Sequence, residues 1–279
     1  MPKSVFHLAP IFVRLTFFVM SVTRGQFLKS LGASAGNAAF GIGLAAATRI
    51  LGGKLTVKLE PLATAAAPDE SSVFSFLESG PPEGNRIALT FEDGPTPGVT
   101  EPILDRLKER GLTATFFMIG QHAAAAPELA RRILAESHTV GNHTYTHPKL
   151  TELPGAQAES ELVRTQDTLA EILNHRPAIF RPPYGSFRKN QSGLARSLGL
   201  RVVLWSVDSR DWTQPGADQI IDAILAQTKA GSIILCHDLH HQTADCLGRV
   251  LDQLLERQYH FVPVTAFLDD APANGPAGI

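Results

Sequence analysis

Apolar residues recur from residue 86 onward in short runs that alternate with helical patterns. Residues 87–91 form an apolar run that ends in Glu-Asp-Gly-Pro, which is typical of a strand followed by a turn. Residues 101–110 carry apolar positions at helical spacing, and Gly111 follows as a stop. Further strands are expected at residues 113–119, 139–142, 178–180, 201–207, 232–236 and 261–264. Further helices are expected at residues 127–136, 157–173, 191–198, 218–229 and 245–257.

Strands that alternate with helices form a parallel sheet with right-handed crossovers. About seven strand–helix units predict an α/β fold, a distorted (β/α) barrel, by analogy with the barrel of eight such units. The polar clusters of the chain fall where the predicted strands end. Because barrels of this type carry catalytic residues at the C-terminal ends of their strands, we expect the active site there.

Residues 1–67 have the composition of a signal or anchor region. They contain almost no acidic residues before Glu60, and their apolar residues include two stretches, 11–22 and 39–47. Neither stretch reaches the roughly 18–20 apolar residues of a membrane-spanning helix. Short apolar segments after positive charge are typical of signal sequences. We therefore expect an exported protein, in the periplasm, the cell envelope or the medium, with an uncleaved N-terminal membrane anchor as the alternative.

The segment at residues 23–29, Thr-Arg-Gly-Gln-Phe-Leu-Lys, resembles the twin-arginine export signal. It departs from that signal at Gly25, where a second arginine is expected. Met20 lies just before the segment and is an alternative start of the chain. Small residues at 63–67 are of the kind that signal peptidases accept. Residues 68–84 contain proline and serine and predict a linker into the folded domain.

Composition narrows the class of protein without identifying it. Hydrophobic residues make up 44% of the 279 residues and charged residues 19%, values that are ordinary for a globular protein. The net charge of −2 gives no basic excess for nucleic acid, and nothing points to a protein partner. Cys236 and Cys246 are too few for a disulfide framework, so two separate thiols are expected, with a single pairing left open.

Two motifs at the predicted strand ends have the chemistry of a metal site. His143 and His147 are spaced four apart, a spacing that places them on one face of a helical turn, where they can bind one metal ion. Glu92 and Asp93 are adjacent carboxylates that repel each other, and a cation relieves this repulsion. One carboxylate can then ligate the metal while the other stays free as a base. Each motif alone also fits a structural role, such as a surface acidic turn.

Three further motifs follow later strands. Prolines after Arg181 fix the backbone, so that this side chain is held and the amide of Tyr184 can be aimed. Residues 205–212 offer two tryptophans beside acidic residues, and indole faces commonly line carbohydrate grooves. His237 leaves a buried strand. A proline turn, a core tryptophan and a structural histidine are the alternative interpretations.

Together and in this order, the motifs resemble the polysaccharide deacetylase family, carbohydrate esterase family 4. The family motifs T-F-D-D-G-P, H-[ST]-x-x-H, R-x-P-Y, D-x-x-D-W and L-H correspond to residues 90–95, 143–147, 181–184, 208–212 and 236–237. The resemblance covers residues 85–268, taken as the catalytic domain, and leaves residues 269–279 as a C-terminal tail. It implies a metal-dependent hydrolase that removes acetyl groups from an N-acetylated polysaccharide, such as peptidoglycan or chitin, and releases acetate.

The resemblance also implies a role for residues in every motif. The implied metal ligands are Asp93, His143 and His147. The other implied roles belong to Glu92 (base), Arg181 (partner of the base), His237 (general acid), Asp211 (orientation of His237), Tyr184 (oxyanion-stabilising amide and substrate contact) and Trp212 (wall of the substrate groove). Two histidines and one carboxylate suit Zn²⁺ best, with Co²⁺, Ni²⁺ or Fe²⁺ as alternatives.

Two positions depart from the family pattern. Glu92 replaces the family aspartate and extends the carboxylate by one methylene, whereas a base must lie within about 2.6–3.2 Å of the water it deprotonates. A catalytically weak glycan-binding homologue is therefore one alternative, and an O-acetyl esterase acting on xylan-like glycans is another. Cys236 stands where the family has a leucine, a position expected to line the acetyl pocket.

Overall fold

A computed structural model describes residues 44–51, 54–61, 76–188 and 191–270. The expected apolar stretch at 11–22, the segment at 23–29 and the small residues at 63–67 lie outside these ranges. The chain divides into two units, residues 1–67 and 68–279. In the first unit, β1 (Leu44–Leu51) and β2 (Lys54–Pro61) form an antiparallel hairpin. Among the described helices, none combines the length and the hydropathy that crossing a membrane requires.

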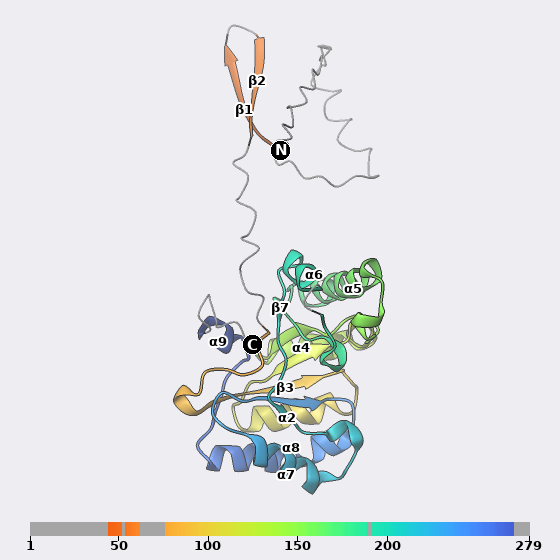
Figure 1. Cartoon of the computed structure of the whole chain (residues 1–279), viewed down its shortest axis with the longest axis vertical. Helices are drawn as coiled ribbons and strands as arrows, with labels where there is room; N and C mark the ends of the chain where they lie inside the picture. The colour runs from red at the N-terminus through yellow and green to blue at the C-terminus, as the bar shows by residue number, and fades with distance from the viewer. Residues whose placement is uncertain (1–43, 52–53, 62–75, 189–190, 271–279) are drawn as a thin grey trace, which may run out of the picture. The chain divides into compact units, whose positions relative to one another are not determined.

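The second unit is built on a parallel sheet (Figure 1). Its strands are β3 (Arg86–Glu92), β4 (Thr115–Met118), β5 (Thr139–Asn142), β6 (Ile179–Phe180), β7 (Arg201–Val202), β8 (Val207–Asp208), β9 (Ile233–His237) and β10 (His260–Phe261). Their order is β7–β6–β5–β4–β3–β9–β8, and β10 pairs with the beginning of β3. The five polar motifs lie at the C-terminal ends of β3, β5, β6, β8 and β9, which are parallel strands and so end at the same edge of the sheet.

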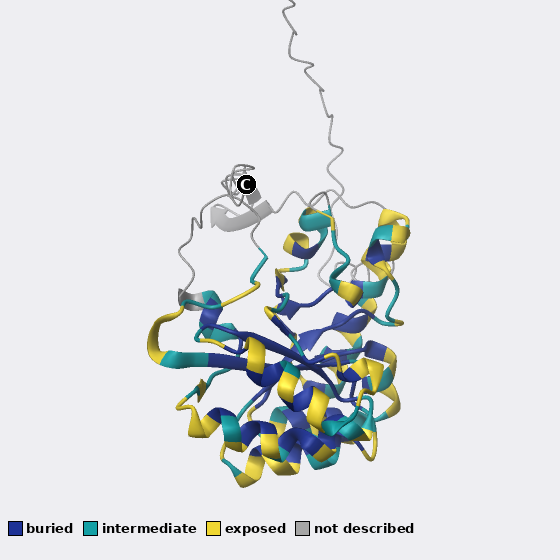
Figure 2. Ribbon diagram, turned by 60° about the horizontal axis from the view of Figure 1, so that its bottom comes forward, coloured by how far each residue is buried: buried dark blue, intermediate teal, exposed yellow. Residues whose placement is uncertain are grey.

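Helices connect the strands and cover the outer face of the sheet. They are α2 (Thr100–Glu109), α3 (Gly120–Ala125), α4 (Pro127–Ala135), α5 (Gly155–Leu173), α6 (Ser192–Ser197), α7 (Ala217–Gln227), α8 (His241–Glu256) and α9 (Thr265–Asp270). Figure 1 shows α2, α7 and α8 side by side along one face, and Figure 2 shows that their buried residues turn toward the sheet. The short helices α3 and α9 were not expected from the sequence.

The alternation of residues along β3 and β9 separates core from site. Phe91 and Cys236 point outward into the large apolar cluster that the helices cover. Their neighbours Glu92, Leu235 and His237 line a cavity on the inner face. Successive side chains of a strand point to opposite faces of a sheet, so a strand end that packs an apolar residue outward presents its next residue inward. The sequence pattern of β3 and β9 thus delivers polar groups into the barrel.

The segment at residues 201–208 closes the barrel. It begins as β7, paired with β6, and ends as β8, paired with β9, so the sheet order starts and finishes on one stretch of chain. The prediction of one continuous strand at residues 201–207 is therefore wrong for residues 203–206, which lie between β7 and β8. There, Leu77 pairs with Val203, although residues 68–84 were expected to form a linker. The Val203 and Leu204 carbonyls accept hydrogen bonds from Arg181 instead of from a neighbouring strand.

Arg181 is fully buried inside the barrel. Its Nη1 donates to Glu92 Oε1 at 3.1 Å and to Thr90 Oγ1 at 2.8 Å, while Nε and Nη2 donate to the carbonyls of Val203 and Leu204 at 3.2 and 2.8 Å. Burial lowers the pKa of Arg181, and the charge of Glu92 opposes this shift. One side chain therefore joins β3, β6 and the closing segment.

We predict that replacing Arg181 with Met destabilises the fold strongly, because it leaves the buried Glu92 carboxylate without its arginine partner. Removing one member of a buried pair typically costs about 3–5 kcal/mol. Adding Glu92→Gln to the same protein should recover part of that loss. Arg110→Met removes a surface pair with Asp252 and should cost about 1 kcal/mol or less. Urea unfolding measures all four proteins, and equal losses for Arg181→Met and Arg110→Met would contradict the interpretation.

Candidate active site

A cavity of about 360 Å³ opens at the C-terminal ends of the strands. It is lined by Glu92, Asp93, His147, Tyr184, Trp205, Asp208, Trp212, Leu235 and His237. These residues come from β3, β8 and β9, from the segments that follow β3, β5, β6 and β8, and from the stretch between β7 and β8. The structure therefore brings residues from all five sequence motifs to one place.

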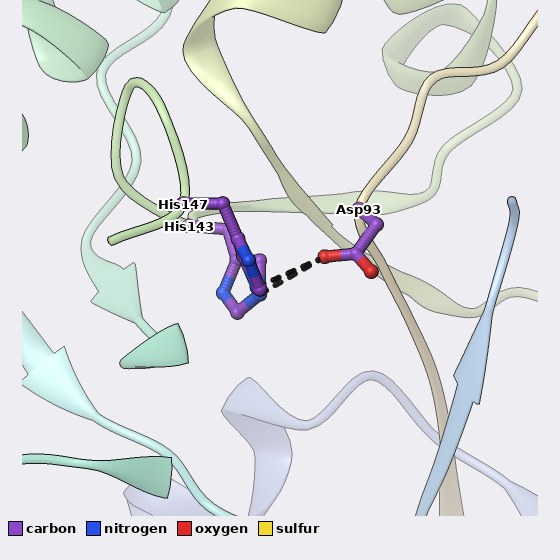
Figure 3. Close-up of side chains that lie close together, drawn as sticks. All are labelled: Asp93, His143 and His147. Atoms are coloured by element: carbon purple, nitrogen blue, oxygen red, sulfur yellow. Dashed lines mark ion pairs between the residues drawn. The ribbon is translucent and has the colours of Figure 1, made fainter. Parts of the chain in front are cut away.

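Asp93, His143 and His147 form a cluster that could bind a metal ion (Figure 3). One ligand atom from each lies within 4.8 Å of the other two. Asp93 Oδ1 is 3.4 Å from His143 Nε2 and 3.2 Å from His147 Nε2. Asp93 Oδ1 and His143 Nε2 are buried and have no hydrogen-bond partner among the described residues. Buried polar atoms are normally paired, so two such atoms facing each other fit a bound cation.

The surroundings of His143 orient its ring for this purpose. Its Nδ1 donates to the Arg181 carbonyl at 2.7 Å, which leaves Nε2 as the free nitrogen toward Asp93. Burial lowers the pKa of His143, but the charges of Glu92 and Asp93 outweigh burial and leave that pKa raised. For Asp93 burial raises the pKa, while the histidines outweigh this and hold it well below its usual range. The cluster therefore favours an ionised carboxylate.

The segment at residues 143–147 is not a helical turn, so that expectation is wrong. Thr144 and His147 have left-handed backbone angles, with φ of 65° and 62°. The N–H groups of residues 144–147 donate to side-chain oxygens of Asn142, Thr144 and Glu161 instead of to helix carbonyls. The four-residue spacing brings the two rings together by this loop geometry, with centroids 4.9 Å apart.

Glu92 lies between Arg181 and the histidines. Its Oε1 accepts the hydrogen bond from Arg181, and its Oε2 is 3.4 Å from His143 Nε2 and 3.8 Å from His237 Nε2. The side chain is buried. The extra methylene thus leaves the carboxylate beside the Asp93–His143–His147 cluster, with Oε1 hydrogen-bonded to Arg181 and Oε2 facing the histidines.

His237 and Asp211 form a second buried pair. Asp211 Oδ1 lies 2.6 Å from His237 Nδ1, while Oδ2 accepts from the His237 backbone N–H at 2.8 Å and from Thr243 Oγ1 at 2.7 Å. Burial lowers the pKa of His237, but pairing with Asp211 outweighs it and raises that pKa to about 9. Thr243 lies in the first turn of α8, which begins at His241, earlier than expected. No sequence signal marked Thr243, because only the fold brings it to Asp211.

Two exposed aromatic side chains flank the cavity. Tyr184 is 61% exposed and Trp212 is 56% exposed, although both are large and partly apolar. The Tyr184 ring packs on the ring of His147, with centroids 4.7 Å apart. Tyr184 has a φ of 60°, and its N–H makes no hydrogen bond to a described residue. Trp205, also expected from the sequence, lies deeper in the cavity.

Leu235, and not Cys236, lines the cavity, so the expectation for Cys236 is wrong. Cys236 belongs to the apolar cluster under the helices, and burial raises its pKa well above the usual value. The strand period of two explains the exchange, because Leu235 shares the inward face with His237. Counting back two residues from the histidine would have identified Leu235. Cys236 and Cys246 are both free and buried, which confirms two separate thiols.

Comparison with known proteins links this site to one family. A family model described as polysaccharide deacetylase matches residues 79–203. A peptidoglycan-N-acetylglucosamine deacetylase of Bacillus cereus is 36% identical over 193 residues, which cover 68% of this chain and 70% of the relative. A chitooligosaccharide deacetylase of Rhizobium leguminosarum is 42% identical over 163 residues, which cover 58% of this chain and 75% of the relative.

Solved structures confirm the distorted barrel. A crystal structure of a peptidoglycan N-acetylglucosamine deacetylase in complex with a hydroxamate-type benzamide matches with a TM-score of 0.67 and 35% identity, over 70% of this chain and 92% of that one. A pseudoenzyme of carbohydrate esterase family 4 from Bacillus anthracis matches with a TM-score of 0.68 and 27% identity, over 71% of this chain and 70% of that one. Relatives of this fold thus include both active and inactive proteins.

We predict that Asp211→Asn lowers the pKa of His237, because it removes the negative charge that raises this pKa to about 9. A change of one pKa unit corresponds to about 1.4 kcal/mol of interaction. NMR titration of the His237 ring measures the shift in the full chain. Asp252→Asn, at a surface pair, is the control and should leave the His237 titration in place. An unchanged His237 pKa in Asp211→Asn would show that Asp211 is not the group that raises it.

Proposed function

The chain belongs to the polysaccharide deacetylase family, and from this we propose that it hydrolyses the N-acetyl groups of a glycan that contains N-acetylglucosamine, releasing acetate. Peptidoglycan and chitin-like oligosaccharides are the proposed substrates, because relatives are named for both. The observation that carries the proposal is the Asp93–His143–His147 cluster beside the free oxygen of Glu92. A hydrolase of amides needs an activated water molecule and a base within hydrogen-bond reach of that water.

We propose that Asp93, His143 and His147 bind one divalent cation, with Zn²⁺ favoured by two imidazoles and a carboxylate, and Co²⁺, Ni²⁺ or Fe²⁺ as alternatives. When bound, such a cation lowers the pKa of a water molecule and polarises the acetyl carbonyl. The orphaned atoms Asp93 Oδ1 and His143 Nε2 support this assignment.

The remaining residues supply proton transfer and charge stabilisation. Glu92 accepts the proton of the attacking water at Oε2 while Arg181 fixes Oε1. The Tyr184 N–H donates to the acetyl oxygen, where negative charge develops as the water adds to the carbonyl carbon. His237 then donates a proton to the departing amine nitrogen as the C–N bond breaks, and Asp211 fixes its orientation. Trp212 and Tyr184 contact the sugar rings from the rim of the cavity.

Acetate release tests the function. The full chain is incubated with peptidoglycan, chitin oligomers and acetylated xylan, with and without a chelator. We expect metal-dependent release from an N-acetylated glycan, and Glu92→Gln should lower kcat roughly 10²–10⁴-fold, the usual contribution of a general base. Glu92→Asp should lose less, because it keeps the carboxylate but draws it back from His143. Glu128→Gln, at an exposed residue, is the control.

Four outcomes would contradict this assignment. Full activity in excess chelator would remove the metal from the mechanism. An unchanged kcat in Glu92→Gln would show that Glu92 is not the base. Release from acetylated xylan alone would favour an O-acetyl esterase, and no release from any substrate would favour a glycan-binding homologue.

We propose further that the protein works outside the cytoplasm, either after cleavage of an N-terminal signal sequence or with its N-terminus anchored in the membrane. Its basic and apolar N-terminal region supports this, and so do relatives named for peptidoglycan, a polymer of the cell wall. Fractionation should find the protein in the envelope, the periplasm or the medium. Deletion of residues 20–44 should leave it inside the cell, and a full-length protein found only in the cytosol would contradict the proposal.

A further inference from the structure

Asp238 is a buried carboxylate that the proposed mechanism does not use. It follows His237 at the end of β9 and is 1% exposed. Within the described part of the chain, no arginine, lysine or histidine forms an ion pair with it. A buried carboxylate is costly unless hydrogen bonds or a charge stabilise it, so its contacts indicate what it does.

The two oxygens of Asp238 bind the turn that carries Asp93 and the first residue of α2. Oδ1 accepts the N–H of Gly94 at 2.9 Å, and Oδ2 accepts the hydroxyl of Thr100 at 2.7 Å. The backbone N–H of Asp238 donates to the Glu92 carbonyl at 3.1 Å. Asp238 therefore binds the residue before Asp93 and the residue after it.

The backbone at Asp93 needs such support. Its φ is 75°, in the left-handed region that residues with a side chain rarely adopt. The carbonyls of this turn are fixed by other groups: Ile119 N–H donates to the Gly94 carbonyl at 3.1 Å, and His122 Nδ1 lies 2.5 Å from the Asp93 carbonyl. Asp238 accepts the Gly94 N–H of the same turn.

Gly94 and Asp238 are matched in shape. A Cβ atom on Gly94 would lie 1.9 Å from Asp238 Oδ2, so only glycine allows the carboxylate to approach the backbone this closely. Thr100 completes the arrangement, since its Oγ1 also accepts the N–H of Thr96 at 2.8 Å. Gly94 and Thr100 therefore both hold the carboxylate of Asp238 in place.

We propose that Asp238 is a positioning residue for the metal site: it fixes the turn at residues 92–94, so that Asp93 Oδ1 stays within 3.4 Å of both histidine nitrogens before a metal binds. The proposal rests on the metal site of the proposed function and adds to it a residue that touches neither metal nor substrate. Groups that orient the ligands of a metal typically contribute 10–100-fold to its affinity.

The test measures metal affinity directly, by chelator competition with Zn²⁺ or Co²⁺ on the full chain, with circular dichroism to show that each variant is folded. Asp238→Ala removes both contacts and should weaken affinity about 10–100-fold. Asp238→Asn should stay close to wild type, because its amide oxygen can accept from Gly94 while its nitrogen donates to Thr100. This rescue by the conservative variant separates positioning from a requirement for charge.

Thr100→Val provides a second variant if Asp238→Ala does not fold. It removes one of the two contacts and should weaken metal binding less than Asp238→Ala, but in the same direction. Thr228→Val is its matched control, since the Thr228 hydroxyl is also buried and donates to a carbonyl at 2.7 Å, but in α7. Thr228→Val should leave metal affinity unchanged.

Equal metal affinity in wild type, Asp238→Ala and Thr100→Val would overturn the proposal, even if the variants melted at lower temperature, because Asp238 would then support only the fold. A wild-type protein that binds no metal would instead overturn the proposed function. The two failures are therefore distinguishable by the wild-type measurement alone.

Discussion

The buried ion pair between Arg181 and Glu92 is the interaction on which both barrel and site depend. Transferring two charges out of water costs several kcal/mol for each ion, and the pair is tolerated only if further hydrogen bonds satisfy it. Arg181 meets that condition through Thr90 and the carbonyls of Val203 and Leu204. These are the carbonyls left open where the closing segment leaves the sheet. The same guanidinium that fixes the base of the proposed reaction therefore completes the barrel wall.

A second constraint is the left-handed backbone of several site residues. Asp93, His147 and Tyr184 all have φ between 60° and 75°, although none is glycine. Each such residue costs roughly 1–3 kcal/mol and persists only where its surroundings determine it. Around Asp93 those surroundings are hydrogen bonds from β9, from the end of β4 and from α3. The site is thus fixed by the sheet and not by the loops alone, which suits a metal site that is formed before its ion binds.

Much of the fold could be predicted from the sequence, because apolar runs at β3 and β9 and helical periods at α2 and α5 are long enough to be distinctive. The motifs at the strand ends could also be predicted to meet, since parallel strands end at one edge. Two features depend on contacts remote in sequence and could not be predicted from it. Hydrogen bonds to Arg181 interrupt the strand expected at residues 201–207. Hydrogen bonds to Glu161 hold residues 143–147 in a loop instead of the expected helical turn. The inward position of Leu235 follows instead from the strand period of two, counted back from His237.

We propose different roles for the two adjacent carboxylates: Asp93 binds the metal, and Glu92 stays on Arg181 as the base. A crystal structure of the zinc-loaded protein, with anomalous diffraction at the zinc edge, tests this proposal most directly. We expect one strong peak per chain, bound by Asp93, His143 and His147, with the Glu92 carboxylate still hydrogen-bonded to Arg181. A zinc ion bound by Glu92 in place of Asp93, or a peak only at another position, would contradict it.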